Sequence, residues 1–292
     1  MRRILTCLAV FLASFALLAA PLAVADPLDV QPAGSAPIPG GPAASWIIAD
    51  MDTGQVLAAR NEDAPSPPAS TIKTLLAQVI LDEVPLDTTI VATEADTQVE
   101  CNCAGVAPGV TYTARQLLEG LLLVSGNDAA NTLARMVGGP DEAVAKMNAK
   151  AALLGAYGTN TGSPSGIDAP GMAMWSTPHD LAVIFRNAMS YPVFAQITSQ
   201  PTAVFPTKTG NKVLVNQDEM LHRYPGFLGG KTGYTDLARK TFVGAAQRNG
   251  RRLVVAMMYG LVHEGGPTYW DQAASLLDWG FALDRNSGVG AL

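Results

Sequence analysis

Two pairs of short apolar runs, placed near opposite ends of the sequence, constrain the fold more than any other feature. Residues 46–49 and 55–58 form the first pair, and residues 241–246 and 253–259 form the second. The second pair is joined through Asn249-Gly250, the strongest short signal for a β-hairpin. Because each pair is expected to form antiparallel strands, the long segment between the pairs is predicted to interrupt a single sheet.

The segment between the strand pairs is predicted to be mainly helical. Apolar residues recur at helical spacing over residues 70–81, and the later runs are rich in Ala and Leu. Thr177, Pro178 and Asp180 form a typical helix start, with Thr177 and Asp180 as a capping box. The other predicted helices cover residues 114–123, 129–137, 142–154, 178–189 and 268–283. This order of elements predicts an α+β fold, in which an all-helical subdomain of about residues 85–200 is inserted into the sheet.

The first 25 residues are typical of a secretory signal peptide. Two arginines precede an apolar stretch, and Ala23-Val24-Ala25 matches an A-x-A cleavage site. A membrane anchor is the alternative, but the stretch is short and Pro and Gly residues follow it at once. We therefore expect an exported protein without a transmembrane anchor after cleavage. Residues 26–44 would be a Pro/Gly-rich linker, and residues 45–292 a single domain.

Charge and cysteine content narrow the partners and the redox chemistry. The formal charge is −6, and loss of the two arginines in the signal peptide would make it −8. An acidic protein of this kind is a poor partner for nucleic acid or an anionic membrane. Cys101 and Cys103 are the cysteines that remain after cleavage. In an oxidising compartment they could form a bridge across a tight turn, or they could stay as two free thiols.

Ser70-Thr71-Ile72-Lys73 is a Ser-x-x-Lys sequence at a predicted helix start. Residues three apart share a helix face, so the amine of Lys73 can reach the hydroxyl of Ser70. A serine hydroxyl needs a neighbouring base to act as a nucleophile, and a lysine becomes such a base when burial or another cation lowers its pKa. We therefore expect Lys73 to titrate below the ordinary lysine value. By itself, the sequence also fits a capping serine followed by a solvated lysine.

Two further sequence elements follow in the chain. Ser125-Gly126-Asn127 lies between two predicted helices, where it could also be an ordinary turn. Lys-Thr-Gly occurs twice, and we interpret the copy at Lys208 as the tip of a polar loop. The copy at Lys231 follows two glycines and precedes the last strand pair. We expect this second copy on an exposed strand edge that could pair with an extended peptide.

Together, and in this order, the three elements are the signature of penicillin-binding proteins and serine β-lactamases. The chain resembles the low-molecular-mass D-alanyl-D-alanine carboxypeptidases of the short, soluble actinobacterial type, over residues 45–283. The resemblance implies a β-lactamase/transpeptidase-like fold, with a cleft between a five-stranded antiparallel sheet and the helical subdomain. It also implies a hydrolase that removes the terminal D-alanine from peptidoglycan stem peptides, is acylated by β-lactams, and needs no metal or cofactor.

The same resemblance implies a role for each residue of the three elements. The catalytic residues would be the nucleophile Ser70, the base Lys73, the proton donor Ser125 and the positioning residue Asn127. The backbone N–H groups of Ser70 and Tyr234 would form the oxyanion hole. The substrate-binding residues would be Lys231, which supplies a second positive charge, together with Thr232, Gly233 and Thr235.

Other readings of the same residues are disfavoured. A common soluble serine β-lactamase needs a deacylating glutamate after Ser-x-Asn, and no glutamate occurs between Ala143 and Asp218. An inactive homologue would bind wall peptide or penicillin without turnover. Such a homologue would lack a catalytic group, and none is missing from the three elements of this chain. A Ser-His-Asp hydrolase would need a Gly-x-Ser-x-Gly elbow, which the sequence does not have. A zinc peptidase would need a second histidine four residues after His263, which is also absent.

Overall fold

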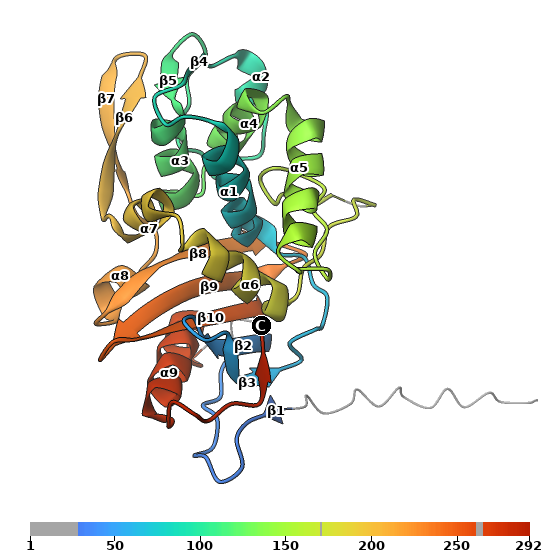
Figure 1. Ribbon diagram of the computed structural model, residues 1–292. Coiled ribbons are helices and arrows are strands. Elements are labelled where there is room, and N and C mark those ends of the chain that lie inside the picture. Colours follow the sequence, from blue (N-terminus) through green and yellow to red (C-terminus); the bar gives the residue numbers. More distant parts are fainter. Residues whose placement is uncertain (1–28, 170, 261–264) are drawn as a thin grey trace, which may run out of the picture.

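The computed structural model describes residues 29–169, 171–260 and 265–292. The predicted signal peptide and His263 lie outside these residues. The main sheet is antiparallel and has the strand order β1-β3-β2-β10-β9-β8, with β11 also paired to β3 (Figure 1). Its five long strands are β2 (Ala43–Asp50), β3 (Gln55–Arg60), β8 (Phe227–Thr235), β9 (Arg239–Arg248) and β10 (Arg251–Gly260). The strands predicted at both ends of the sequence therefore do meet in one sheet.

The two remaining strands of this sheet are short additions at its outer edge. Strands β1 (Asp29–Val30) and β11 (Gly290–Ala291) have two residues each, and both pair with β3. The sheet thus holds the five strands implied by the resemblance and two more that the sequence did not indicate. Strand β1 belongs to the segment for which the sequence predicted a linker, and the indole of Trp279 donates a hydrogen bond to the carbonyl of Ala36 in that segment.

Both faces of the sheet are buried, because alternate side chains along its strands point to opposite faces and are apolar on each. On β2, Ile47 and Ala49 pack into the cluster that contains most of the helices, whereas Trp46 and Ile48 pack into a second cluster with α9 (Tyr269–Ala282). Successive residues of a strand point to opposite faces, so an apolar run without polar interruptions covers both sides. Figure 1 shows α9 on one side of the sheet and the other long helices on the opposite side.

The helices between β3 and β8 are those that position the site. A 3₁₀ turn, η1 (Ala69–Ile72), leads into α1 (Lys73–Glu83), which is the central helix of this part and is buried along most of its length. The other helices are α2 (Glu94–Thr97), α3 (Ala114–Leu123), α4 (Asn127–Met136), α5 (Pro140–Leu153), α6 (Pro178–Ala188), α7 (Pro192–Ser199) and α8 (Met220–Arg223). Helices α3, α4, α5 and α6 pack around α1, and α6 also packs against β2 and β10 of the sheet.

Several local predictions need correction. The helix predicted from Ser70 begins as a 3₁₀ turn, and its α-helical part starts at Lys73. Thr177 caps α6 as predicted, because its hydroxyl accepts from the N–H of Asp180. The Asp180 carboxylate does not complete a capping box, since it accepts instead from the hydroxyl of Thr159. The sequence analysis also missed α7 and two small two-stranded sheets, β4–β5 (Thr89–Val91 and Thr111–Thr113) and the hairpin β6–β7 (Thr202–Thr207 and Gly210–Val215).

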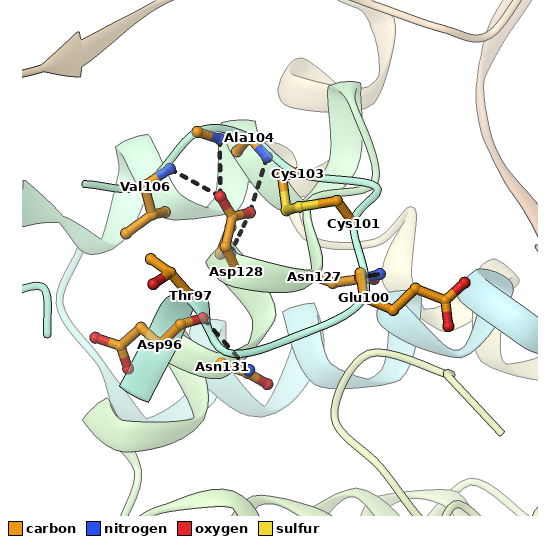
Figure 2. The surroundings of a disulfide bond; sticks show 12 residues. Asp96, Thr97, Glu100, Cys101, Cys103, Ala104, Val106, Asn127, Asp128 and Asn131 are labelled. Carbon is orange, nitrogen blue, oxygen red and sulfur yellow. Dashed lines mark hydrogen bonds between the residues drawn. A yellow bond between two sulfur atoms is a disulfide. The ribbon is translucent and has the colours of Figure 1, made fainter. Parts of the chain in front are cut away.

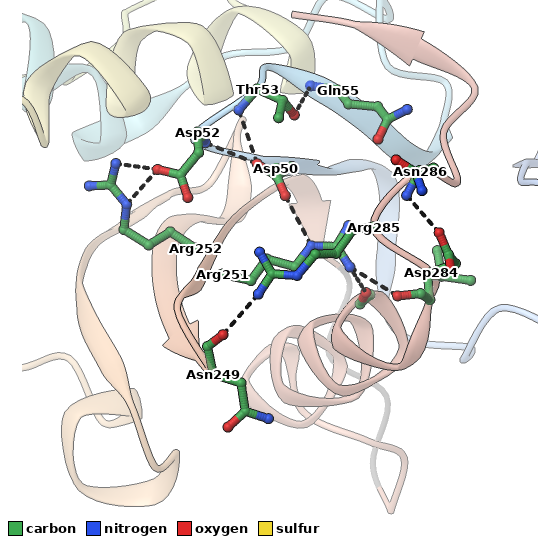
Figure 3. A network of polar contacts seen from close by, with 12 residues as sticks. Asp50, Asp52, Thr53, Gln55, Asn249, Arg251, Arg252, Asp284, Arg285 and Asn286 are labelled. Carbon is green, nitrogen blue, oxygen red and sulfur yellow. Dashed lines mark hydrogen bonds and ion pairs between the residues drawn. The ribbon is translucent and has the colours of Figure 1, made fainter.

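A buried ion pair fixes the end of α9 to the sheet (Figure 3). The Arg251 guanidinium donates to the Asp50 carboxylate at 2.9 Å and to the carbonyls of Gly280 and Leu283 at 3.2 and 3.0 Å. Burial tends to raise the pKa of Asp50, but hydrogen bonds from the backbone N–H of Thr53, from Arg251 and from the N–H of Asp52 outweigh burial and leave that pKa below its ordinary value.

Candidate active site

The three sequence elements meet at one cleft between the sheet edge and the helical part. The cleft has a volume of about 710 Å³. Seven of the predicted site residues line it: Ser70, Ser125, Asn127, Thr232, Gly233, Tyr234 and Thr235. The two predicted lysines, Lys73 and Lys231, lie buried beneath this lining, at 0% and 2% exposure. The structure therefore brings every predicted site residue into one region.

Ser70 and Lys73 form the centre of the site. The Nζ atom of Lys73 lies 2.7 Å from Ser70 Oγ, 2.7 Å from Asn127 Oδ1 and 2.6 Å from the carbonyl oxygen of Ser165. Two of these partners can only accept a hydrogen bond, whereas a hydroxyl can also donate one. This environment suits a neutral amine, which has two N–H donors and one lone pair.

Burial and charge both favour the neutral form of the Lys73 amine. Burial lowers the pKa of Lys73 well below its ordinary value, and the nearby charge of Lys231 lowers it further, whereas Asp128 opposes this shift. Burial also lowers the pKa of Lys231, to about 7, with Asp218 as the opposing charge. Asp218 is itself buried, which raises its pKa to about 7. Two buried amines thus lie in a region where an ammonium ion is poorly solvated.

The backbone is strained at two positions beside the cleft. Ala69, directly before Ser70, has a φ of 49°, and Ser125 has a φ of 58°. Residues other than Gly, Asn and Asp rarely adopt this left-handed conformation, and its cost is tolerated mainly where the surroundings impose it. Ser125 follows the end of α3 and precedes α4, as the sequence predicted, and its side chain is nearly fully buried.

Strand β8 supplies the other wall of the cleft. It is the last strand in the sheet order, and its residues 231–235 pair with β9 on one side. Gly233 is required here by close approach, because a Cβ atom at this position would lie 2.9 Å from the backbone nitrogen of Ser70. The backbone of Gly233 therefore lies directly against the 3₁₀ turn that carries Ser70.

Thr235 has partners of its own. Its hydroxyl donates to Asp168 Oδ2 at 2.6 Å and accepts from the N–H of Ala238 at 2.9 Å. A hydroxyl has a single hydrogen to donate. In this arrangement Thr235 offers that hydrogen to Asp168, so any other acceptor in the cleft would have to displace Asp168 to receive it.

The two Lys-Thr-Gly copies have different surroundings. Lys231 lies in β8 and is buried beside the cleft, as described above. Lys208 and Thr209 form the turn between β6 and β7, far along the hairpin that projects from the helical part (Figure 1). The interpretation of Lys208 as a loop tip is therefore confirmed by its position.

The sequence analysis missed four residues that shape the site. Ser165 contributes a backbone carbonyl to Lys73, and Asp168 engages Thr235. Asp218 is a buried carboxyl near Lys231. The carbonyl of Glu100 accepts a hydrogen bond from Asn127 Nδ2 at 2.7 Å. Contacts made by backbone carbonyls cannot be predicted from side-chain identity, because every residue has a carbonyl. Single aspartates in polar loops are too common to be singled out in one sequence.

No helix within residues 29–169, 171–260 and 265–292 is both long and apolar enough to cross a bilayer. In the same part of the chain, no three His, Cys, Asp or Glu side chains gather as they would around a metal ion.

Comparison with known proteins yields close relatives. The chain is 69% identical over 264 residues to D-alanyl-D-alanine carboxypeptidase DacB2 of Mycobacterium tuberculosis, covering 90% of this chain and 91% of that protein. It is 32% identical over 281 residues to the D-alanyl-D-alanine carboxypeptidase of Streptomyces sp. strain K15, covering 90% and 95% of the two chains.

Solved structures give the same result at the level of the fold. The crystal structure of D-alanyl-D-alanine carboxypeptidase from Mycobacterium tuberculosis superimposes with a TM-score of 0.89 at 69% identity, covering 90% of this chain and 100% of that one. The Streptomyces K15 DD-transpeptidase superimposes with a TM-score of 0.78 at 29% identity, covering 85% and 100%. The predicted transpeptidase-like fold is thus confirmed.

Residues 34–260 also match the family Peptidase_S11, described as D-alanyl-D-alanine carboxypeptidase. These relatives and this family match, found for a chain with the site geometry described above, show that the chain belongs to the D-alanyl-D-alanine carboxypeptidase family.

Proposed function

We propose that this protein is a serine D-Ala-D-Ala carboxypeptidase that removes the terminal D-alanine from peptidoglycan stem pentapeptides through an acyl-enzyme on Ser70. One observation carries the proposal. A serine hydroxyl in a cleft lies 2.7 Å from a fully buried amine whose pKa is lowered by burial and by a second amine. This is the arrangement that a serine nucleophile and its general base require.

The hydrogen-bond partners of the Lys73 amine support its role as the base. In the neutral form, its two N–H groups donate to Asn127 Oδ1 and to the Ser165 carbonyl, and its lone pair faces the Ser70 hydroxyl. As Ser70 Oγ bonds to the carbonyl carbon of the substrate, the hydroxyl proton moves to Lys73. The backbone N–H groups of Ser70 and Tyr234 then stabilise the negative oxygen, each by about 3 kcal/mol.

The remaining groups complete the cycle. Ser125 relays the proton that Lys73 took from Ser70 to the departing amine as the peptide bond breaks, so D-alanine leaves and Lys73 is neutral again. A water molecule then attacks the ester carbon while one of its protons moves to Lys73 and from there to Ser70 Oγ, which restores the Ser70 hydroxyl and releases the shortened peptide. Lys231, Thr232, Gly233 and Thr235 hold the substrate along the exposed edge of β8, with Thr235 released from Asp168.

The proposal includes the substrate class and the place of action. We infer export of the chain and action on wall peptides outside the membrane, because residues 1–25 are typical of a signal peptide. β-Lactams are expected to acylate Ser70, because their strained amide resembles the scissile bond.

A defined pentapeptide ending in D-Ala-D-Ala tests the proposal directly. We expect mass spectrometry to detect loss of one D-alanine, and a fluorescent penicillin to label the same protein stably. A penicillin adduct that turns over rapidly would support a β-lactamase instead. An intact pentapeptide together with an unlabelled protein would support an inactive homologue.

The rate of Ser70 acylation is expected to rise with pH and to level off well below the ordinary lysine pKa of about 10.4. Burial and the Lys231 charge lower the pKa of Lys73, and the neutral amine is the active form. Raising the pH through that lowered pKa therefore increases the active fraction until it saturates. Stopped-flow acylation by a chromogenic β-lactam measures the profile. A rate that still increases through about pH 10.4 would show that Lys73 has an ordinary pKa.

Lys231→Ala and Lys208→Ala form a matched pair within the two Lys-Thr-Gly copies. We expect Lys231→Ala to slow acylation about 100-fold or more, because the variant loses a buried amine beside the cleft that is partly protonated at neutral pH, with its pKa of about 7. Lys208→Ala removes a charge from an exposed turn and should change the rate by less than about twofold. Acylation kinetics of both variants make the comparison. A slow Lys208→Ala beside a fast Lys231→Ala would reverse the assignment of the two copies.

A further inference from the structure

A short loop closed by a disulfide bond lies against the residue that orients the proposed base. Cys101 and Cys103 form a disulfide, with their Cα atoms 4.8 Å apart, which settles the question that the sequence left open (Figure 2). The loop residues Glu100, Cys101 and Asn102 line the same cleft as Ser70. The loop is therefore part of the site and not a remote cross-link.

The loop holds Asn127 through two backbone carbonyls. The carbonyl of Glu100 accepts from Asn127 Nδ2 at 2.7 Å, and the carbonyl of Asn102 accepts from the backbone N–H of Asn127 at 2.7 Å. Asn102 lies inside the ring that the bridge closes and Glu100 directly precedes that ring, so the bridge restricts the backbone torsions that place both carbonyls. Figure 2 shows the Asn127 side chain reaching toward Glu100 beneath the two sulfur atoms.

The contact with Glu100 decides which way the Asn127 amide faces. Because Nδ2 is held by the Glu100 carbonyl, Oδ1 must face Lys73, where it accepts from Nζ at 2.7 Å. A rotated amide would place Oδ1 against another carbonyl and would point an N–H group at the Lys73 amine. That N–H would compete with the Ser70 hydroxyl for the lone pair of the base.

We propose that the Cys101–Cys103 bridge is a redox-sensitive positioning device for Lys73, acting through Glu100 and Asn127. The inference rests on the proposed function, because it concerns the rate of acylation at Ser70. With the bridge formed, the amide presents its oxygen to Lys73. With the bridge open, the loop no longer fixes the Glu100 carbonyl, the amide samples both orientations and acylation slows.

The surrounding contacts keep the effect local. The carboxylate of Asp128 accepts from the backbone N–H groups of Ala104, Gly105 and Val106, each at 2.8 Å. These bonds anchor the chain directly after the bridge, and Figure 2 shows them on the far side of Cys103. Opening the bridge therefore frees the residues before Cys103 while the segment after it stays attached to α4.

The chemistry is ordinary thiol–disulfide exchange. A small dithiol gives up two electrons and two protons to form its own cyclic disulfide, and the Cys101–Cys103 bond becomes two thiols. Cys101 is exposed in the cleft, so such a reductant can reach it. An exported chain would close the bridge in an oxidising compartment, and a chain still in the reducing cytosol would carry the open, slower form.

The test measures acylation by a fluorescent penicillin before and after treatment with a small dithiol, with thiol titration to confirm opening. We expect the acylation rate constant to fall about tenfold, which corresponds to loss of one well-oriented hydrogen bond, and the dissociation constant of the non-covalent complex to stay unchanged. Reoxidation should restore the rate. The Cys101→Ser/Cys103→Ser double variant should match the reduced protein and ignore the dithiol.

Asn127→Ala separates positioning from a general structural effect. In this variant the amide is gone, so reduction should change the residual rate by less than about twofold. An equal slowing in Asn127→Ala, or a change confined to the dissociation constant, would show that the bridge only shapes the cleft and would overturn the inference. Unchanged acylation after reduction would do the same while leaving the proposed function intact. An oxidised protein that never labels would instead contradict the proposed function.

Discussion

Ser70→Ala is expected to abolish covalent labelling by penicillin and to reduce D-alanine release by about 10⁴-fold or more. The physical reason is that Ser70 Oγ is the hydroxyl placed 2.7 Å from the lowered-pKa amine of Lys73. A second hydroxyl, that of Ser125, also lines the cleft. Mass spectrometry of the intact protein after penicillin treatment measures the adduct.

Ser125→Ala provides the matched control for this prediction. Ser125 is proposed to move a proton and not to form a bond, so its alanine variant should still form the adduct, although more slowly. An adduct that persists in Ser70→Ala and disappears in Ser125→Ala would exchange the two roles. Peptide mapping of the labelled protein identifies the modified residue in either case.

Lys73→Met is expected to slow acylation by about 10³-fold, within the range that general base catalysis contributes. Methionine is unbranched and close to lysine in length, so it fills the buried space beside Ser70 without supplying a lone pair of sufficient basicity. Acylation by a chromogenic β-lactam measures the loss. A thermal melt checks that the variant is folded, since Asn127 Oδ1 and the Ser165 carbonyl lose a donor.

Lys73→Arg distinguishes the base from a mere positive charge. Arginine keeps the charge but stays protonated at any accessible pH, so it cannot accept the Ser70 proton. We therefore expect Lys73→Arg to be nearly as slow as Lys73→Met. An arginine variant within about tenfold of the wild type would mean that Lys73 acts by charge alone.

The side chains of the three elements could be predicted from the sequence, but the backbone groups that contact them could not. Ser70, Lys73, Ser125, Asn127 and Lys231 could be named because three elements, each weak alone, occur in the order that the family resemblance requires. The contacts of Asn127 with Glu100 and of Lys73 with Ser165 are made by carbonyl groups, which every residue has. Their positions depend on tertiary packing that no local pattern records.

Loop side chains were equally hidden from the sequence. Asp168 reaches Thr235 from a segment 67 residues earlier in the chain, and Asp218 lies near Lys231 from the loop before α8. Neither aspartate has a periodic or spaced neighbour that would single it out. Only the fold, which brings these loops to the edge of β8, gives them a partner.

The fold itself was predictable where periodicity and turn chemistry agreed. The hairpin through Asn249-Gly250 and the helix that ends at Leu123 were placed well, because strong patterns extend over whole elements. The β6–β7 hairpin was missed although Ala203 and Phe205 are buried and Val204 is exposed, an alternation typical of a strand. Pro206 and the polar residues that follow it up to Lys212 favour a loop, so the sequence does not indicate the strands on either side of that turn.

The left-handed backbone at Ala69 and Ser125 has a consequence for engineering the protein. A glycine at either position would adopt the same torsion angles without the cost of about 1 kcal/mol that an L-side chain incurs there. At residue 125 that substitution would also delete the hydroxyl that serves the leaving amine. A selection for thermal stability alone would therefore favour a glycine at residue 125, although that variant would lose turnover. Stabilising substitutions that keep the activity should be sought away from these two positions.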